Sequence, residues 1–148
     1  MIQLVDRDLV FLKIQELEKY LHELEKYRGI TAEEMENDLA KLWTVQHGLQ
    51  LSIQIILDTG NHILAEKGIS IKEYAEIFPE LARLGIIPKD YAEDIKGMAG
   101  LRNLLVHEYA GIELERIAAF INNNLGDFNH FAGYILSYLE QEKNNGNL

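Results

Sequence analysis

Hydrophobic residues recur three and four positions apart along almost the whole chain, which is the spacing of an amphipathic α-helix. The first such stretch predicts a helix from Leu4 to Tyr27, and Gly29 is a suitable C-terminal stop. No Asn-Gly or Asp-Gly turn separates two runs of alternating polarity, so a β-hairpin is not expected. The pattern therefore predicts an all-α fold. The apolar stripe of the first helix is predicted to contain Phe11, Ile14, Leu17, Leu21 and Leu24.

Two sequences of the capping-box type predict where the following helices begin. Thr31 with Glu34 is predicted to start a long second helix that continues to Lys67 and ends at Gly68. Gly60 lies in the apolar stripe of this helix, where the lack of a side chain would let another helix approach closely.

The second capping box, Ser70 with Glu73, is predicted to start a short third helix that ends at Gly85. A fourth helix is predicted to begin at Pro88 or at the residue after it, because proline is favoured in the first turn of a helix. The last turns of this helix then carry residues 102–109, which hold the most varied polar chemistry of the chain.

A final helix is predicted to begin at residue 112 or 113 and to run to about Glu142, with a break at Asn122-Asn123-Asn124 and Gly126 left open. Short connections between long helices favour antiparallel neighbours. We therefore expect an up-down bundle of four main helices plus a short extra helix. Residues 1–142 are predicted to form one helical domain, and the polar tail 143–148 is predicted to be disordered.

Composition narrows the class of protein further. The chain has 148 residues, no cysteine and a formal net charge of −10. Such acidity argues against a broad basic surface for nucleic acid, so DNA is not expected as a partner and any contact with RNA must be local. Charges interrupt the apolar residues of the N-terminus, and no segment approaches the roughly 20 apolar residues that span a bilayer. We expect a cytoplasmic protein without a membrane partner.

The candidate chemistry is concentrated in the stretch from Gly100 to Tyr109. Arg102 can bind phosphate as a bidentate fork, and His107 belongs to the residue type whose ordinary pKa suits proton transfer near neutral pH. No His-Glu-x-x-His motif, cysteine ligand or glycine-rich phosphate loop occurs. The residues therefore indicate phosphodiester chemistry without a metal or another cofactor. An arginine and a histidine near a helix end are also favoured by the helix dipole alone, so a purely structural role stays open.

Helix geometry limits how Arg102 and His107 can cooperate. On a regular helix, two residues five positions apart point about 140° away from each other. Three solutions are open: the helix ends near Val106, the long arginine side chain reaches back, or a second subunit completes the site. Asn103 stands four positions before the histidine and can share its face.

The number of proton transfers favours the third solution. Cleavage of RNA needs a base for the 2′-hydroxyl, an acid for the leaving 5′ oxygen and a cation for the charge that develops on the phosphate. His107 can perform one of the two proton transfers at a time, and Arg102 can supply the charge. A symmetric dimer with two copies of the fourth helix across a cleft would provide two histidines and two arginines.

The string from Arg102 to Tyr109, with Asn103 after the arginine, resembles the signature of the HEPN superfamily and in particular of its HepT-like toxin ribonucleases. The similarity covers most of the chain from about residue 39 to 138. The stretches that carry it outside the motif are 49–64, 74–88, 98–103 and 125–128.

This resemblance implies a metal-independent endoribonuclease, active as a homodimer, with Arg102 and His107 as catalytic residues. It also implies a toxin–antitoxin pair in which a nucleotidyltransferase antitoxin transfers AMP to Tyr109 and silences the toxin. An adenylylated tyrosine adds bulk and a phosphodiester charge beside the arginine, and would therefore compete with RNA for that cation.

Three more polar residues are candidates for positioning the substrate or supporting the site. Asp58, Asn61 and His62 lie within one turn of the second predicted helix. They either face the cleft, together with Asn103, or they form ordinary surface contacts such as an ion pair between the aspartate and the histidine. For the chain as a whole, a non-catalytic module that binds a nucleotide or a nucleotidyltransferase is the alternative to the ribonuclease.

Overall fold

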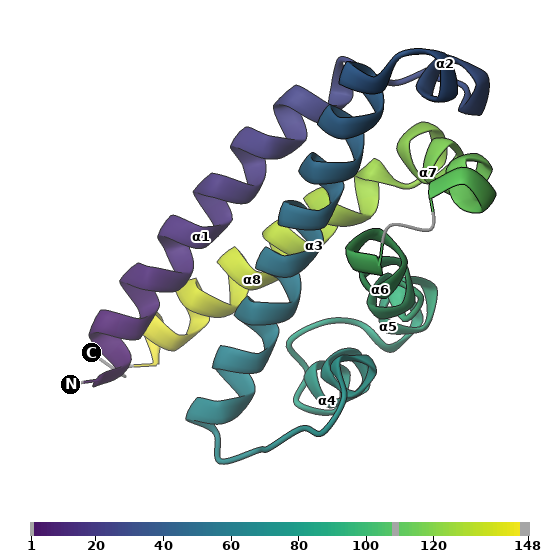
Figure 1. Cartoon of the computed structure of the whole chain (residues 1–148). Helices are drawn as coiled ribbons and strands as arrows, with labels where there is room; N and C mark the ends of the chain where they lie inside the picture. Colours follow the sequence, from purple (N-terminus) through teal and green to yellow (C-terminus); the bar gives the residue numbers. More distant parts are fainter. Residues whose placement is uncertain (1, 108–109, 146–148) are drawn as a thin grey trace.

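Three long helices and several short ones make up the fold in the computed structural model, which describes residues 2–107 and 110–145 (Figure 1). These described residues contain helices and no strand, so the predicted all-α class is confirmed. The elements are α1 (Ile2–Glu25), α2 (Ala32–Asn37), α3 (Leu39–Glu66), the 3-10 helix η1 (Tyr74–Glu76), α4 (Ile77–Arg83), α5 (Lys89–Ile95), α6 (Met98–His107), α7 (Ala110–Asn123) and α8 (Leu125–Asn144).

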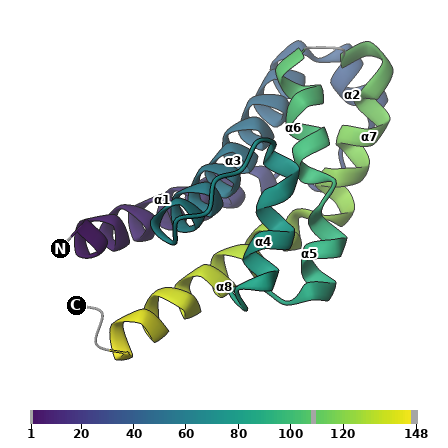
Figure 2. The same ribbon diagram turned by 90° about the horizontal axis from the view of Figure 1, so that it is seen from below.

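The long helices α1, α3 and α8 lie along one side of the molecule, and the shorter helices α4 to α7 gather on the other (Figures 1 and 2). α1 packs against both α3 and α8, while α3 also contacts α4 and α6. α3 is therefore the element that joins the two sides. Its side chains between Leu49 and Leu64 are mostly buried, as expected of a helix that is covered on several faces.

Four of the five residues predicted for the apolar stripe of α1 are buried in the structure. Ile14, Leu17, Leu21 and Leu24 are buried, whereas 46% of Phe11 is exposed. Val10 takes the inward position instead, because it stands four residues before Ile14 and continues the regular four-three spacing of the stripe. The prediction for Phe11 was therefore wrong.

The predicted long second helix is in fact two helices. The capping box of Thr31 and Glu34 is present, but it starts only the six residues of α2. Asp38 has an extended backbone with φ −135° and ψ 97°, and its carboxylate accepts hydrogen bonds from the N–H groups of Ala40 and Lys41 at 3.1 and 3.3 Å. This aspartate therefore caps α3 and separates it from α2.

The start of the third predicted helix also differs. Instead of Ser70 with Glu73, the capping box is formed by Glu73 with Glu76, whose carboxylate accepts the N–H of Glu73 at 2.9 Å. The helical turns accordingly begin at Tyr74. The predicted stop at Gly85 is confirmed by a φ of +77°, a conformation that glycine adopts without strain.

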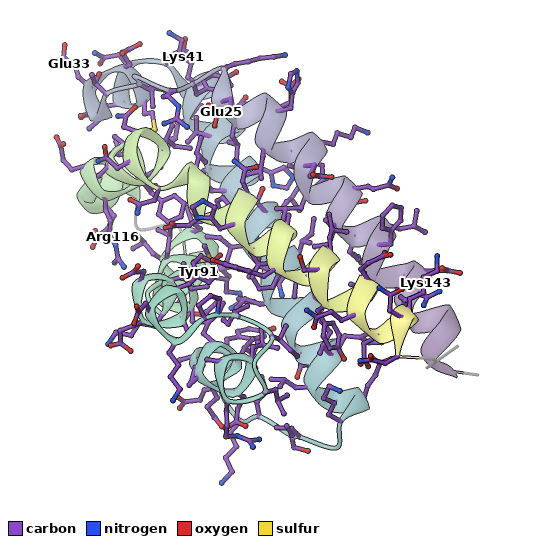
Figure 3. All side chains as sticks on the ribbon, turned by 180° about the vertical axis from the view of Figure 1, so that it is seen from behind. Glu25, Glu33, Lys41, Tyr91, Arg116 and Lys143 are labelled. Carbon is purple, nitrogen blue, oxygen red and sulfur yellow. The ribbon has the colours of Figure 1, made fainter. Side chains whose placement is uncertain are left out.

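The fourth and fifth predicted helices are each divided in two. The fourth is interrupted at Lys96 and Gly97, which separate α5 from α6, and the break that was left open near Asn122-Asn123-Asn124 occurs at Asn124, between α7 and α8. α8 continues to Asn144, two residues past the predicted end of the domain, and Figure 3 shows Lys143 in its last turn. Of the predicted tail, residues 146–148 lie outside the described residues.

α5 and α8 are joined by a buried tyrosine. Tyr91 lies between the two helices, where its hydroxyl donates a hydrogen bond to the backbone carbonyl of Asp127 (Figure 3). Burial raises the pKa of Tyr91 above its usual range, and the nearby Asp127 carboxylate adds to this effect.

None of the helices in the described part of the chain is long and apolar enough to cross a membrane.

The close approach predicted at Gly60 is confirmed and has a measurable consequence. A Cβ atom added there would lie 2.5 Å from Cγ2 of Ile77, while one added at Gly133 in α8 would meet no neighbouring atom within 4 Å. Both substitutions to alanine gain the same helix propensity, about 1 kcal/mol, so their difference isolates the clash. We expect Gly60→Ala to be less stable than Gly133→Ala by about 1–3 kcal/mol in urea unfolding.

Gly133→Ala serves as the matched control, because it is expected to raise the unfolding midpoint slightly. Equal stabilisation by both substitutions would contradict the packing of α4 against α3 at Gly60.

Candidate active site around Arg102

Arg102 lies in the middle of α6, and three neutral groups hold its guanidinium. Nε donates a hydrogen bond to Oε1 of Gln54 at 3.2 Å, and Nη1 donates one to Oδ1 of Asn103, also at 3.2 Å. The carbon of the guanidinium lies 5.2 Å from the centre of the Tyr74 ring, which is the geometry of a cation–π contact. α3, η1 and α6 therefore converge on this side chain, because α6 packs against both of the other elements.

The contacts continue from Gln54 to a carboxylate. Nε2 of Gln54 donates a hydrogen bond to Oδ1 of Asp58 at 2.8 Å, one turn further along α3, and lies 3.5 Å from the hydroxyl of Tyr74. The aspartate thus acts on the arginine through the amide of the glutamine rather than by direct contact.

The charge of Arg102 is not matched by a carboxylate among the described residues. Several surface cations, in contrast, lie 2.5–2.7 Å from a glutamate, as in Arg28 with Glu25 and Arg83 with Glu80. An arginine that is held only by amides and a ring keeps its full attraction for an anion. This arrangement leaves the guanidinium able to bind an anion such as a phosphate group.

An open depression lies next to this arginine, between η1, α3 and α6. Its volume is about 740 Å³, and its lining includes Asn61, Tyr74, Gly100 and Asn103. A Cβ atom at Gly100 would meet only a nitrogen of Arg116, at 3.9 Å, so this part of α6 leaves the depression unobstructed. The depression can admit a ligand of nucleotide size.

The predicted site residues lie in different relations to Arg102. Asn103 contacts it directly, Asp58 reaches it through Gln54, and Asn61 lies in the wall of the adjoining depression. His62 instead lies with its Nε2 atom 3.8 Å from a carboxylate oxygen of Glu66, further along α3. The described contacts of the aspartate therefore lead through Gln54 to the arginine, whereas the described contact of the histidine is with Glu66.

His107 is the last residue of α6, and its side chain, like the whole of Tyr109, lies outside the described residues. α6 is continuous from Met98 to His107, so the helix does not end before the histidine. The contacts of Arg102 direct its side chain to α3 and η1. The helix end that was predicted near Val106 lies one residue later, at His107.

Gln54 and Tyr74 were not identified from the sequence as site residues. Gln54 interrupts an otherwise apolar run in α3 and stands four residues before Asp58, which is the spacing of a helix-surface pair. That polar interruption is the signal that could have identified it. Tyr74 lies within the third predicted helix, and its contact with Arg102 depends on tertiary packing that periodicity does not reveal.

A second hollow, of about 610 Å³, lies between α3 and the end of α6. Trp43 and Val106 contribute to its lining, and Gln46 donates a hydrogen bond to the backbone carbonyl of Leu105 at 3.2 Å. Trp43 is 63% exposed and Leu39, one turn earlier on α3, is 55% exposed. We call the exposed apolar residues Leu39, Trp43 and Val106 the Trp43 surface. It adjoins the helix end that carries His107.

Comparison with known proteins identifies close similarities over most of the chain. The sequence model of the family described as "Ribonuclease HepT-like" matches residues 17–135. A tRNA nuclease HepT of Aphanizomenon flos-aquae is 30% identical over 133 residues, which cover 88% of this chain and 90% of that protein. An mRNA nuclease HepT of Shewanella oneidensis is 25% identical over 129 residues, which cover 86% and 96% of the two chains.

The fold is also found among solved structures. A tri-AMPylated HEPN toxin of Shewanella oneidensis, in complex with MNT antitoxin, matches with a TM-score of 0.76 and 24% identity. The match covers 88% of this chain and 98% of the toxin. The arrangement of helices around Arg102 is therefore a HEPN fold.

Proposed function

Because the chain belongs to the HepT-like ribonuclease family, we propose that it is a metal-independent endoribonuclease and the toxin of a toxin–antitoxin pair. The observation that carries this proposal is the neutral setting of Arg102, which lies beside an open depression and on the same helix as His107. Both relatives described above are named as nucleases of RNA, which supports the same class of reaction.

In the proposed reaction, the 2′-hydroxyl of a nucleotide attacks the neighbouring phosphorus. A bond forms between the 2′ oxygen and phosphorus, and the bond from phosphorus to the 5′ oxygen breaks. A base takes the proton of the 2′-hydroxyl, and an acid gives a proton to the leaving 5′ oxygen. Arg102 stabilises the negative charge that develops on the phosphate oxygens, and His107 performs one of the two proton transfers.

We propose that the active unit is a homodimer, since one histidine performs only one proton transfer at a time. The Trp43 surface is the suitable contact, because it exposes apolar residues beside the end of α6. A two-fold contact at this surface would bring two copies of that helix end near each other. The second copy would then provide the second histidine.

The dimer contact can be tested with Trp43→Glu. A buried aromatic anchor contributes about 2 kcal/mol or more, so the dimer Kd is expected to rise about thirtyfold or more. RNA cleavage should fall in parallel. Sedimentation equilibrium across a range of concentrations measures the Kd.

Phe11→Glu is the matched control, because it places the same charge on an exposed apolar residue of α1. A monomeric Phe11→Glu variant beside an unchanged Trp43→Glu dimer would place the contact on α1 and contradict the assignment.

We further propose that a nucleotidyltransferase antitoxin silences the enzyme by transferring AMP to Tyr109. Tyr109 stands two residues after His107 in the sequence. The phosphodiester group on its side chain would carry a negative charge. Such a charge would compete with RNA for Arg102. The proposed binding partners of the enzyme are thus its RNA substrate and the nucleotidyltransferase antitoxin, and we expect both in the cytoplasm. DNA is not a proposed partner.

Intact-mass measurement tests this modification. Protein produced together with the proposed nucleotidyltransferase antitoxin is expected to gain the mass of one or more AMP groups, whereas protein produced alone gains none. Tyr109→Phe should remove the added mass at that residue. An unchanged mass increment in Tyr109→Phe would show that AMP is attached elsewhere.

The ribonuclease itself is tested with purified protein and a mixture of cellular RNAs in the presence of a chelator. Cleavage by the wild type is the expected result. The names of the two relatives refer to different RNA classes, tRNA and mRNA, so both classes belong in the substrate mixture. A tight complex with the nucleotidyltransferase without cleavage of any RNA would favour the non-catalytic binding module instead.

A further inference from the structure

We propose that Gln54 is a positioning residue that fixes Arg102 through a neutral amide, so that the guanidinium is oriented without losing its charge to a carboxylate. This inference rests on the proposed ribonuclease function, because it gives Gln54 a role in the same reaction. Three contacts carry it: Arg102 to Gln54 at 3.2 Å, Gln54 to Asp58 at 2.8 Å and Arg102 to the Tyr74 ring at 5.2 Å.

The two neighbours of Gln54 determine which way its amide points. A guanidinium can only donate hydrogen bonds, and an ionised carboxylate can only accept them. The amide must therefore direct its oxygen toward Arg102 and its NH2 group toward Asp58. This is the arrangement in the structure. Asp58 thus sets the orientation of Gln54, and Gln54 in turn holds Nε of the arginine.

The contacts use only part of the donor set of Arg102. Nε is held by Gln54 and Nη1 by Asn103, while Tyr74 lies close to the guanidinium at cation–π distance. No hydrogen bond joins Nη2 to any side chain that the structure describes. The guanidinium is therefore fixed through two of its three nitrogens, and the third can donate to an oxygen of the substrate phosphate.

The neutrality of Gln54 matters because a glutamate could occupy the same place. It would also accept the hydrogen bond of Nε, but as an ion pair, which is roughly twice as strong as a neutral contact. That ion pair would compete with the phosphate for the charge of Arg102. It would also place two carboxylates next to each other at positions 54 and 58, where like charges repel.

Three variants separate position from charge. Gln54→Met keeps the size of the side chain and removes both hydrogen bonds. Gln54→Glu keeps the acceptor but adds a negative charge. Gln15→Glu makes the same chemical change on the exposed face of α1, far along the chain from the site, and controls for the change in net charge.

We expect kcat for RNA cleavage to fall about tenfold to a hundredfold in Gln54→Met, as estimated from the loss of a hydrogen bond to a charged group. In Gln54→Glu, KM should rise as well. The slope of log KM against log salt concentration should decrease by about 0.7, which corresponds to the loss of one phosphate contact by a single strand. Gln15→Glu should keep the wild-type kcat and slope.

A second measurement does not depend on activity. The chain has five arginines, so the Nε–H signals in a nitrogen-edited NMR spectrum are few, and Arg102→Lys identifies the signal of Arg102. In the wild type this proton should exchange slowly with water because Gln54 accepts it. Exchange should accelerate in Gln54→Met and remain slow in Gln54→Glu. Asp58→Asn, which can donate as well as accept, should give intermediate exchange and an intermediate kcat.

Wild-type kcat, KM and salt slope in both Gln54→Met and Gln54→Glu would overturn the proposal, as would fast exchange of the Arg102 Nε–H in the wild type. If one Gln54 variant fails to fold in a thermal melt, Asp58→Asn provides the same test, and unchanged exchange and kcat there would also overturn it. A slow Nε–H in a wild type that cleaves no RNA would instead contradict the proposed function and leave the contact between Gln54 and Arg102 intact.

Discussion

Replacing Arg102 by lysine is expected to lower kcat/KM for RNA cleavage by about 10²- to 10³-fold, the range observed when one donor that stabilises a developing oxyanion is removed. Lysine keeps the positive charge but lacks the planar fork of nitrogens. Its three donors lie on a single nitrogen, so it cannot reproduce the separate contacts of Nε with Gln54 and of Nη1 with Asn103 while it also donates to a phosphate. Steady-state cleavage of a labelled oligonucleotide measures the loss.

The matched control is Arg83→Lys, which makes the same change in an exposed ion pair with Glu80. This variant is expected to cleave RNA at the wild-type rate. Both variants should unfold at nearly the same temperature as the wild type, because exposed or half-exposed contacts contribute little to stability. Full activity in Arg102→Lys would show that the site needs only a point charge and would contradict the role of the held guanidinium.

His107→Ala is expected to reduce cleavage by about 10²- to 10⁴-fold, which is the usual contribution of a general acid or base. The rate of the wild type should also depend on pH in the range where a histidine ordinarily titrates, about pH 6 to 7. A plot of log kcat/KM against pH should bend in this range. In His107→Ala the residual rate should lose that bend.

His22→Ala is the corresponding control, since His22 is exposed in the last turns of α1. It should retain both the rate and the pH profile of the wild type. If His107→Ala kept the bend, the titrating group would be another residue, and the assignment of the proton transfer would be wrong.

The sequence was sufficient to predict those parts of the fold that depend on local chemistry. Gly29, Gly68 and Gly85 were predicted to end helices, and all three have a positive φ, between +76° and +97°. A break in the Asn-rich segment before Leu125 was left open, because asparagine competes with helical hydrogen bonds, and the structure has this break at Asn124.

The division of the second predicted helix into α2 and α3 could not be predicted, because it depends on competition between two residues that can each cap a helix N-terminus. Thr31 and Asp38 are both suitable N-caps seven residues apart, and the apolar spacing continues through the second one. Periodicity alone therefore favoured a single helix. In the structure the aspartate adopts an extended backbone and caps α3, which lets α2 turn away and pack against α7.

The candidate site shows the same division. Arg102 and Asn103 are neighbours in the sequence, so their contact could be expected. Asp58 was named from the sequence as a candidate for supporting the site, and the structure connects it with Arg102 through Gln54. Gln54 was missed, because it contacts Arg102 across 48 positions of the chain and only the packing of α6 against α3 brings them together. Helical spacing predicts which residues share a face, but not which faces of two helices meet.

The chemical ends of the products show whether RNA is cleaved by its own 2′-hydroxyl with the help of Arg102 and His107. Purified protein is incubated in chelator with an RNA oligonucleotide, with an all-deoxy oligonucleotide of the same sequence and with RNA bearing one 2′-deoxy residue at the cleaved position. Attack by the 2′-hydroxyl gives a 2′,3′-cyclic phosphate and a 5′-hydroxyl, so we expect these ends, no cleavage of the all-deoxy oligonucleotide and no cleavage at the single 2′-deoxy residue. A 5′-phosphate, or cleavage at the 2′-deoxy residue, would contradict this mechanism.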